Sequence, residues 1–375
     1  MGKFDKFVPE HVRALASYTP GKPVRQAERE SGVRCIKMAS NENPLGPSPK
    51  ALAAIREAAA QGNYYPDDEV SELRLRLAER HGVATEQILV TAGTTSFLSI
   101  IARTLLGTAS KAITSEHTFI VYAIAVRAAG GHLVQVPMKG HCYDLEAIAA
   151  AIDASTRVIF VANPDNPTGT MVDAAAMDAF VAKLPEHVLL VLDEAYCDFA
   201  SDFAAQRGMQ YSHSLEYVRK ERNVVVLRTF SKAHGLAGLR IGYGLGPAEL
   251  MQHFNRVRTT FSVTAVAEAA ALAALGDEAH IRKTIENNRA GSEYLTNKLR
   301  ELGFDPVPTF ANFLFFDAGE DAFALSKRMQ AEGVIVRPLT AWGIPTGIRV
   351  TIGTVEQNQR FLTALAKAME KATVR

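Results

Sequence analysis

The sequence has few cysteines, and their arrangement excludes two common kinds of site. Its 375 residues include three cysteines, Cys35, Cys142 and Cys197. An odd number of widely spaced cysteines provides neither a disulfide framework nor the paired ligands of a zinc site. Free thiols are typical of a reducing compartment. We therefore expect a cytoplasmic protein without a structural metal.

The chain also lacks an excess of charge and a long apolar run. Lys plus Arg total 41 and Asp plus Glu total 40, a net charge of +1. This balance does not favour binding to nucleic acid or to an acidic membrane surface. No apolar run approaches the length of a membrane span, and the start "MGKFDKFVPEHVRAL" has no signal-peptide core. What remains is an ordinary globular composition, long enough for two domains.

Short β-branched apolar runs alternate with alanine-rich helical patterns between residues 85 and 246. We expect strands near residues 87–93, 111–116, 132–138, 157–164, 187–196, 223–232 and 239–246. Several runs are apolar at consecutive positions, which is typical of strands covered on both faces of a mainly parallel sheet. Helical patterns lie between them, near residues 96–106, 144–152 (with Asp144 as the cap) and 172–184. The alternation predicts an α/β fold with a mainly parallel seven-stranded sheet flanked by helices.

The pattern changes near residue 263. A long helical region over residues 265–302 leads into apolar runs near residues 312–319, 334–339 and 348–354. We expect a small α+β domain over residues 263–375, joined by an N-terminal arm over residues 1–40. The large, ligand-binding domain is expected over residues 41–262.

Polar side chains follow four of the predicted strands. In an open α/β sheet, ligands bind beyond the carboxyl ends of the strands. The side chains found there are Thr94 and Thr95, then Asn166, then Asp193 and Tyr196, and finally Ser231, Lys232 and Arg240. Each has an ordinary explanation by itself, such as a helix cap, a turn, an ion pair or a solvated lysine. Their occurrence together at four strand ends favours one shared site.

Pyridoxal 5′-phosphate is the ligand that needs all of these groups. Its aldehyde reacts with a lysine amine such as Lys232, which then serves as general base and acid. We expect desolvation and Arg240 to keep that amine partly neutral. Asp193 would hold a proton on the ring nitrogen, and Asn166 and Tyr196 would contact the ring hydroxyl.

The phosphate of that cofactor needs a second group of donors. The helix that begins at Thr94 and Thr95 offers backbone N–H groups and hydroxyls. Ser231 and the guanidinium of Arg240 would complete the anion site.

Six motifs, in this order, resemble those of fold type I aminotransferases, and more narrowly the histidinol-phosphate aminotransferase family. They are "ASNENPLGPSP", "YYPD", "NPDNPTGT", "DEAY", "RTFSKAHGLAGLRIGYG" and "VIVRPL…IRVTIGT". The resemblance covers nearly the whole chain, from Tyr18 to the last helix. It implies a homodimer that transfers the amino group of histidinol phosphate to 2-oxoglutarate in histidine biosynthesis, with active sites at the subunit interface.

The resemblance also implies roles for residues that the pattern alone does not single out. Tyr65 would reach the cofactor phosphate of the other subunit, and Phe119 would stack on the cofactor ring. Taken by themselves, these residues are a loop tyrosine that packs locally and a core phenylalanine.

The substrate residues are likewise implied by the resemblance. Arg349 would bind the substrate carboxylate, Arg337 and Tyr18 would hold the distal phosphate, and Asn43 would lie near the substrate. Without the resemblance, Arg337 would be a strand-end arginine paired with a nearby acid.

Some positions depart from the family pattern. His117 replaces a usual proline, Thr95 replaces a common acidic residue, Trp342 replaces a frequent tyrosine, and no asparagine lies around Val263. Most of these lie near the expected substrate pocket, so two alternatives stay open. One is an aminotransferase for aromatic amino acids, and the other is a lyase that resembles threonine-phosphate decarboxylase.

Overall fold

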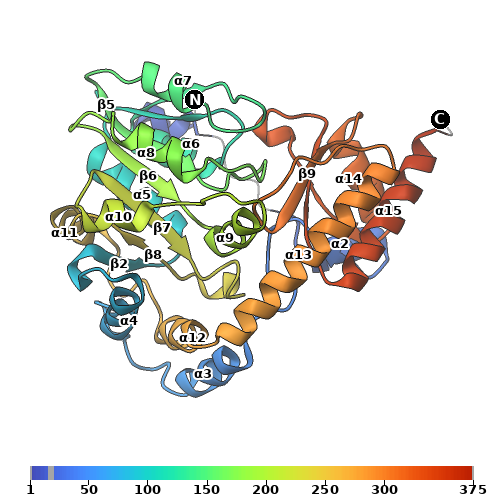
Figure 1. The fold of residues 1–375 in the computed structure, drawn as a ribbon, viewed down its shortest axis with the longest axis horizontal. Helices are drawn as coiled ribbons and strands as arrows, with labels where there is room; N and C mark the ends of the chain where they lie inside the picture. The colour runs from blue at the N-terminus through green and yellow to red at the C-terminus, as the bar shows by residue number, and fades with distance from the viewer. Residues whose placement is uncertain (1, 16–20, 374–375) are drawn as a thin grey trace.

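The computed structural model describes residues 2–15 and 21–373. A seven-stranded sheet with the order β2-β8-β7-β6-β5-β3-β4 forms its larger part (Figure 1). The strands are β2 (Ile88–Thr91), β3 (Lys111–Ser115), β4 (His132–Val136), β5 (Thr156–Ala162), β6 (Leu189–Asp193), β7 (Val224–Thr229) and β8 (Gly242–Leu245). Strands β3 to β7 pair in parallel, and β8 runs antiparallel to both of its neighbours. The predicted seven-stranded, mainly parallel sheet is confirmed.

Helices surround this sheet (Figure 1). They are α3 (Pro49–Ala59), α4 (Ser71–His81), α5 (Thr94–Leu105), α6 (Val121–Ala128), α7 (Leu145–Ala150), α8 (Ala174–Val181), α9 (Cys197–Gln206), α10 (Ser214–Arg219), α11 (Ala248–Val257) and α12 (Ala265–Leu275). The three helical patterns expected between strands correspond to α5, α7 and α8. The Asp144 carboxylate caps α7 by accepting hydrogen bonds from two backbone N–H groups, as its position suggested.

The second part of the molecule contains two small sheets. The strands are β1 (Ile36–Lys37), β9 (Phe313–Asp317), β10 (Val334–Ile335), β11 (Arg337–Pro338) and β12 (Gly347–Thr351). Strands β11, β12 and β9 form an antiparallel sheet, while β1 pairs with β10 in parallel. The helices α13 (Glu278–Glu301), α14 (Ala322–Ala331) and α15 (Val355–Thr373) lie beside them in Figure 1. A separate apolar core of buried residues fills this part.

The long helical region expected over residues 265–302 is divided in two. Helix α12 ends at Leu275, and α13 begins at Glu278. Gly276 and Asp277 separate the helices, and the Asp277 carboxylate accepts a hydrogen bond from the backbone N–H of His280. Glycine ends helices readily and aspartate favours the N-cap, so both residues promote the break.

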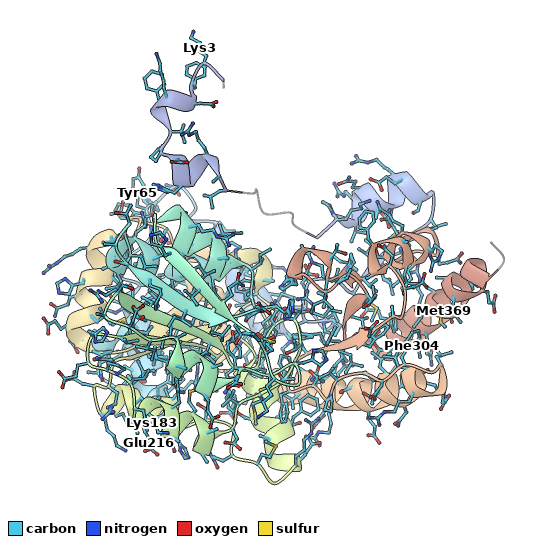
Figure 2. The ribbon with its side chains drawn as sticks, turned by 90° about the horizontal axis from the view of Figure 1, so that it is seen from above. Lys3, Tyr65, Lys183, Glu216, Phe304 and Met369 are labelled. Carbon is cyan, nitrogen blue, oxygen red and sulfur yellow. The ribbon has the colours of Figure 1, made fainter. Side chains whose placement is uncertain are left out.

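The N-terminal segment contacts both parts of the molecule. Helix α2 (Val24–Ser31) packs against α14, and β1 adds a strand beside β10. The turn η1 (Asp5–Phe7) and helix α1 (Glu10–Arg13) precede them, and α1 contacts α6 beside the large sheet. Figure 2 shows the segment around Lys3 projecting away from the body of the molecule. The domain boundaries at residues 40 and 262 stay a prediction.

Three more 3-10 turns complete the described elements: η2 (Thr85–Gln87), η3 (Ala237–Leu239) and η4 (Thr340–Trp342). Over residues 2–15 and 21–373, no helix has both the length and the apolar character needed to cross a membrane.

Candidate active site

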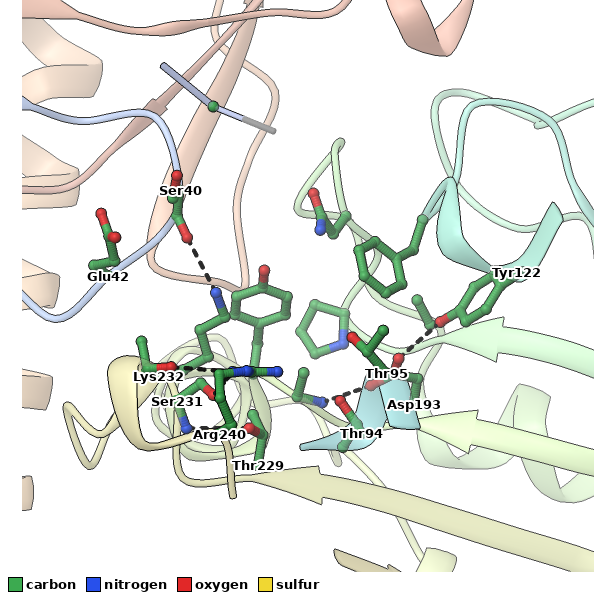
Figure 3. Close-up of a pocket in the computed structure, with 18 of the residues that line it drawn as sticks. Ser40, Glu42, Thr94, Thr95, Tyr122, Asp193, Thr229, Ser231, Lys232 and Arg240 are labelled. Atoms are coloured by element: carbon green, nitrogen blue, oxygen red, sulfur yellow. Dashed lines mark hydrogen bonds between the residues drawn. The ribbon is translucent and has the colours of Figure 1, made fainter. Parts of the chain in front are cut away.

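A cavity of about 330 Å³ lies where the parallel strands end (Figure 3). Nine of the ten residues predicted to contact the cofactor line it: Thr94, Thr95, Phe119, Asn166, Asp193, Tyr196, Ser231, Lys232 and Arg240. They come from α5, from the loop before α6 and from the segments that follow β5, β6 and β7. The parallel sheet brings these segments to one edge, so residues up to 146 positions apart share one cavity.

Lys232 presents a half-buried amine to this cavity. Its Nζ atom donates a hydrogen bond to the carbonyl oxygen of Ser40 at 3.1 Å. Desolvation, followed by the guanidinium of Arg349, lowers the pKa of Lys232 to about 8. Arg240 acts in the same direction with a smaller effect, while the carboxylate of Glu42 opposes it. A fraction of the amine is therefore neutral near pH 7, and Arg349 contributes more to this than the predicted Arg240.

Asp193 ends β6 as a buried carboxylate with a fixed orientation. Its Oδ2 atom accepts a hydrogen bond from the Tyr122 hydroxyl at 3.0 Å, and its Oδ1 atom accepts one from the N–H of Ala195 at 3.3 Å. Burial raises the pKa of Asp193 to about 6. The side chain is therefore mostly ionised at pH 7, so it can stabilise a positive charge in the cavity.

Tyr122 was missed by the sequence reasoning. It is fully buried on α6, lines the cavity, and its ring meets Phe119 edge to face at 5.5 Å. A tyrosine three residues after a predicted ring-stacking phenylalanine lies on the same side of a helix start. That spacing could have indicated that Tyr122 faces the cavity. Its hydrogen bond to Asp193 could not be predicted, because it depends on where the sheet places the end of β6.

The start of α5 forms a cradle with Ser231 and Arg240. Gly93 precedes α5 at φ 82°, and a Cβ atom added there would lie 2.5 Å from Nη2 of Arg240. The Nη1 atom of Arg240 donates to the Ser231 hydroxyl at 3.4 Å. The first N–H groups of a helix have no intrahelical acceptors and attract anions. The absence of a side chain at Gly93 therefore lets the Arg240 guanidinium lie against the start of α5, and together these groups offer donors for a phosphate.

Asn166 and Tyr196 are held by neighbours from the second part of the molecule. The Asn166 side-chain oxygen accepts a hydrogen bond from Nη1 of Arg349, and the Tyr196 hydroxyl accepts one from the Asn41 amide at 2.9 Å. Arg349 also donates from Nη2 to the carbonyl oxygen of Ala39 at 2.7 Å. Arg349 is thus fixed at the edge of the cavity, although it does not line it.

Asn43, predicted to lie near the substrate, is anchored by hydrogen bonds of its side chain. Its amide nitrogen donates to the carbonyl oxygen of Ala233 at 2.8 Å and to the Thr284 hydroxyl at 3.1 Å. Its side-chain oxygen accepts from the N–H of Leu45 at 2.9 Å. These bonds anchor the loop, and Asn43 does not line the cavity. Asn41, two residues earlier, is the asparagine that contacts Tyr196 and was missed.

The remaining predicted residues lie away from this cavity or outside the described residues. Tyr65 is 82% exposed and its ring lies 4.9 Å from that of Phe261. Tyr18 falls outside the described residues. The guanidinium of Arg337 lies 5.0 Å from the centre of the Trp342 ring, at a second cavity.

His117 makes a structural contact. Its Nδ1 atom forms a hydrogen bond of 2.5 Å with the carbonyl oxygen of Trp342, which connects the loop before α6 to η4. The contact therefore gives His117 a structural role, which is to hold this loop against η4.

The whole chain is similar to proteins of known activity. The family model for class I and II aminotransferases matches residues 33–365. A histidinol-phosphate aminotransferase of Moorella thermoacetica is 44% identical over 362 residues, which cover 96% of this chain and 92% of that protein. Histidinol-phosphate aminotransferase 2 of Pseudomonas fluorescens is 44% identical over 373 residues, 99% of each chain. The crystal structure of histidinol-phosphate aminotransferase from Sinorhizobium meliloti in complex with pyridoxal-5′-phosphate superposes with a TM-score of 0.89 at 30% identity, covering 97% of this chain and 98% of that chain.

Proposed function

The chain belongs to the class I and II aminotransferases and, within them, to the histidinol-phosphate aminotransferase family, and we propose that it transfers the amino group of L-histidinol phosphate to 2-oxoglutarate. The products are imidazole acetol phosphate and glutamate, and the cofactor is pyridoxal 5′-phosphate. The reaction is a step of histidine biosynthesis. We place it in the cytoplasm, which agrees with the free thiols of Cys35, Cys142 and Cys197.

The observation that carries this proposal is a pair of arginines beside a reactive lysine. Arg337 and Arg349 lie opposite each other on β11 and β12, and Arg349 contacts Asn166 at the edge of the cavity that contains Lys232. Histidinol phosphate carries a phosphate and no carboxylate, whereas 2-oxoglutarate carries two carboxylates. Guanidinium groups bind both kinds of anion as bidentate partners, so one pocket can serve both substrates.

The residues of the cavity fit the cofactor, and each has a separate role in binding it or in moving a proton. When bound, pyridoxal phosphate supplies an electron sink for the charge that develops on the amine-bearing carbon. Lys232, partly neutral, takes a proton from that carbon and delivers it during the transfer. Asp193, oriented by Tyr122 and Ala195, keeps a proton at the ring nitrogen. Phe119, which lines the cavity, would pack against the cofactor ring and exclude water from it.

The anion cradle positions the cofactor. Thr94 and Thr95 begin α5, and Arg240 lies beside Ser231 opposite them. With the phosphate held here, Asn166 and Tyr196 would be the residues that hold the ring hydroxyl, since both line the same cavity. The contact of Arg349 with Asn166 then joins the substrate side of the cavity to the cofactor side.

We propose a homodimer with shared active sites. Tyr64 and Tyr65 are 72% and 82% exposed, and Phe261 beside them is 46% exposed. Exposed aromatic clusters of this kind commonly mark interfaces. Tyr65 lies outside the cavity of its own chain, so its proposed contact with the cofactor phosphate is made in the other subunit.

Product analysis tests the reaction class. Purified protein with pyridoxal phosphate, L-histidinol phosphate and 2-oxoglutarate should form glutamate in equal amounts with the oxo product. Release of carbon dioxide from a phosphorylated amino acid without any 2-oxo acid would instead identify a lyase. Glutamate formation from L-phenylalanine but not from L-histidinol phosphate would identify an aromatic aminotransferase.

A further inference from the structure

A second cavity of about 470 Å³ adjoins the first, and Gly21 lines both. Three cationic side chains line it, Lys22, Lys327 and Arg337. They come from distant parts of the sequence, which are the segment before α2, helix α14 and strand β11. The fold therefore brings three positive charges together beside the proposed reaction site.

The two lysines form a cluster with one carboxylate. The Lys22 ammonium lies 2.5 Å from Glu30 and next to Lys327, and this proximity lowers the pKa of Lys327. Two ammonium groups in contact repel each other, and one carboxylate does not neutralise both. The formal charges of Lys22, Lys327, Arg337 and Glu30 sum to two positive. A phosphate monoester near pH 7 carries nearly the opposite charge.

The position of Gly21 connects this cluster to the reactive amine. A Cβ atom added at Gly21 would lie 3.2 Å from the Ser40 hydroxyl and 3.8 Å from Nη1 of Arg337. The carbonyl oxygen of Ser40 accepts the hydrogen bond of Lys232. Gly21 therefore lies between the reactive amine and the second cavity. This position leaves a path for the far end of an elongated amino donor whose amine is at Lys232.

The walls between the charges suit a flat ring. The Trp342 ring lies under the guanidinium of Arg337, and apolar side chains from β10 and α14 line the cavity together with Ser326, Gln330 and Thr340. A substrate with a heteroaromatic ring and a terminal phosphate matches both features.

We propose that Lys22 and Lys327 complete a phosphate subsite with Arg337 and select an amino donor with a dianionic end over carboxylate and aromatic donors. This inference rests on the proposed function and adds two specificity-determining residues to it. The lysines act on binding of the donor and take no part in the proton transfer.

Single lysine variants test the selectivity. Lys22→Ala and Lys327→Ala should each raise the KM for L-histidinol phosphate about tenfold, because each removes one charge-assisted contact with the phosphate. The KM for L-phenylalanine should change by less than about twofold, since that donor has no distal anion. Lys298→Ala is the matched control, because Lys298 on α13 also pairs with a glutamate, Glu301, at 2.6 Å.

A binding measurement separates this subsite from catalysis. Trp342 is the one tryptophan of the chain, so tryptophan fluorescence of the cofactor-loaded protein reports on the second cavity. Inorganic phosphate should change this signal saturably in the wild type and in Lys298→Ala. The half-saturating phosphate concentration should rise about tenfold in Lys22→Ala and Lys327→Ala, and high salt should weaken binding in all proteins.

Two results would overturn the inference. The first is phosphate binding by both lysine variants with the affinity of Lys298→Ala. The second is an equal loss for L-phenylalanine and L-histidinol phosphate, which would indicate a structural role. If the wild type rejects L-histidinol phosphate, the proposed function fails instead, and the phosphate titration still decides whether the two lysines bind the anion.

Discussion

Arg337 and Arg349 lie directly opposite each other on the antiparallel strands β11 and β12. Like charges at opposed positions of a sheet destabilise it unless other groups compensate. Here the Trp342 ring lies against one guanidinium, while Asn166 and the carbonyl oxygen of Ala39 accept hydrogen bonds from the other. An arrangement that keeps two cations together, one lining the second cavity and one contacting Asn166 at the edge of the first, favours anionic substrates.

The first prediction concerns the geometry of Arg349. Arg349→Lys keeps the charge but removes the planar fork that contacts Asn166 and Ala39. We expect kcat/KM for glutamate to fall about a hundredfold, since an ammonium cannot replace a bidentate contact. Arg360→Lys is a control, because Arg360 lies on α15 and does not line either cavity. Equal effects of both substitutions would exclude Arg349 as a substrate ligand.

Lys232 provides the most direct test of the chemistry. Lys232→Ala should lower turnover at least about a thousandfold, because the other lysine that lines the cavity, Lys37, is paired with Glu42 at 2.7 Å. Circular dichroism and the midpoint of thermal unfolding should show that the fold persists. A variant with nearly wild-type turnover would remove Lys232 from the mechanism.

The prediction for Gly93 concerns the anion cradle. Gly93→Ala would place a methyl group 2.5 Å from Nη2 of Arg240. The affinity for pyridoxal phosphate should fall more than about tenfold, because the methyl group would displace the Arg240 guanidinium from the cradle and a positive φ is strained for alanine. Gly303→Ala is the matched control, since φ is 88° there and nothing lies within 4 Å of the added atom.

Equilibrium dialysis measures both affinities. If Gly93→Ala and Gly303→Ala bind the cofactor with the same affinity, the methyl group at Gly93 has no specific effect. The phosphate cradle would then not be at Gly93.

Asp193 leads to a prediction about pH. Burial raises its pKa from the ordinary 3.8 to about 6, so in the cofactor-free protein the folded state retains a proton that the unfolded state releases between these values. The stabilisation that the bound proton gives the folded state is complete below pH 4 and is lost as the pH rises through about 6, at a total cost of about 3 kcal/mol. Asp165, buried with the same raised pKa, contributes a similar loss.

Asp193→Asn removes one of these two titrations. The free energy of unfolding in urea, measured from pH 4 to pH 7 without cofactor, should therefore fall less steeply in this variant than in the wild type. Parallel curves would show that Asp193 does not titrate in this range.

Much of the cavity could be predicted from the sequence, because its residues follow strands. Asp193 and Lys232 each come directly after a buried apolar run, and parallel strands bring such positions to one edge. The order of the strands and the reversed direction of β8 required the structure, since runs of apolar residues do not encode their neighbours.

Contacts between segments that lie far apart in the sequence could not be predicted from the order of apolar runs. The Tyr122 hydroxyl on α6 reaches Asp193 at the end of β6 across 71 positions of sequence, and Lys22 meets Lys327 across 305 positions. Asn43 was chosen from a motif, whereas Asn41 in the same loop contacts Tyr196. A motif identifies a loop, but side-chain direction depends on how that loop packs.

The measurement that tests the account most directly is a half-reaction without any 2-oxo acid. Cofactor-loaded protein is mixed with L-histidinol phosphate or with L-phenylalanine, and the absorbance of the cofactor is followed as it accepts the amino group. The account predicts that L-histidinol phosphate converts the cofactor at least about tenfold faster at equal low concentrations, because only this donor carries a distal phosphate for Arg337. Faster conversion by L-phenylalanine would contradict the proposed substrate and indicate an aromatic aminotransferase.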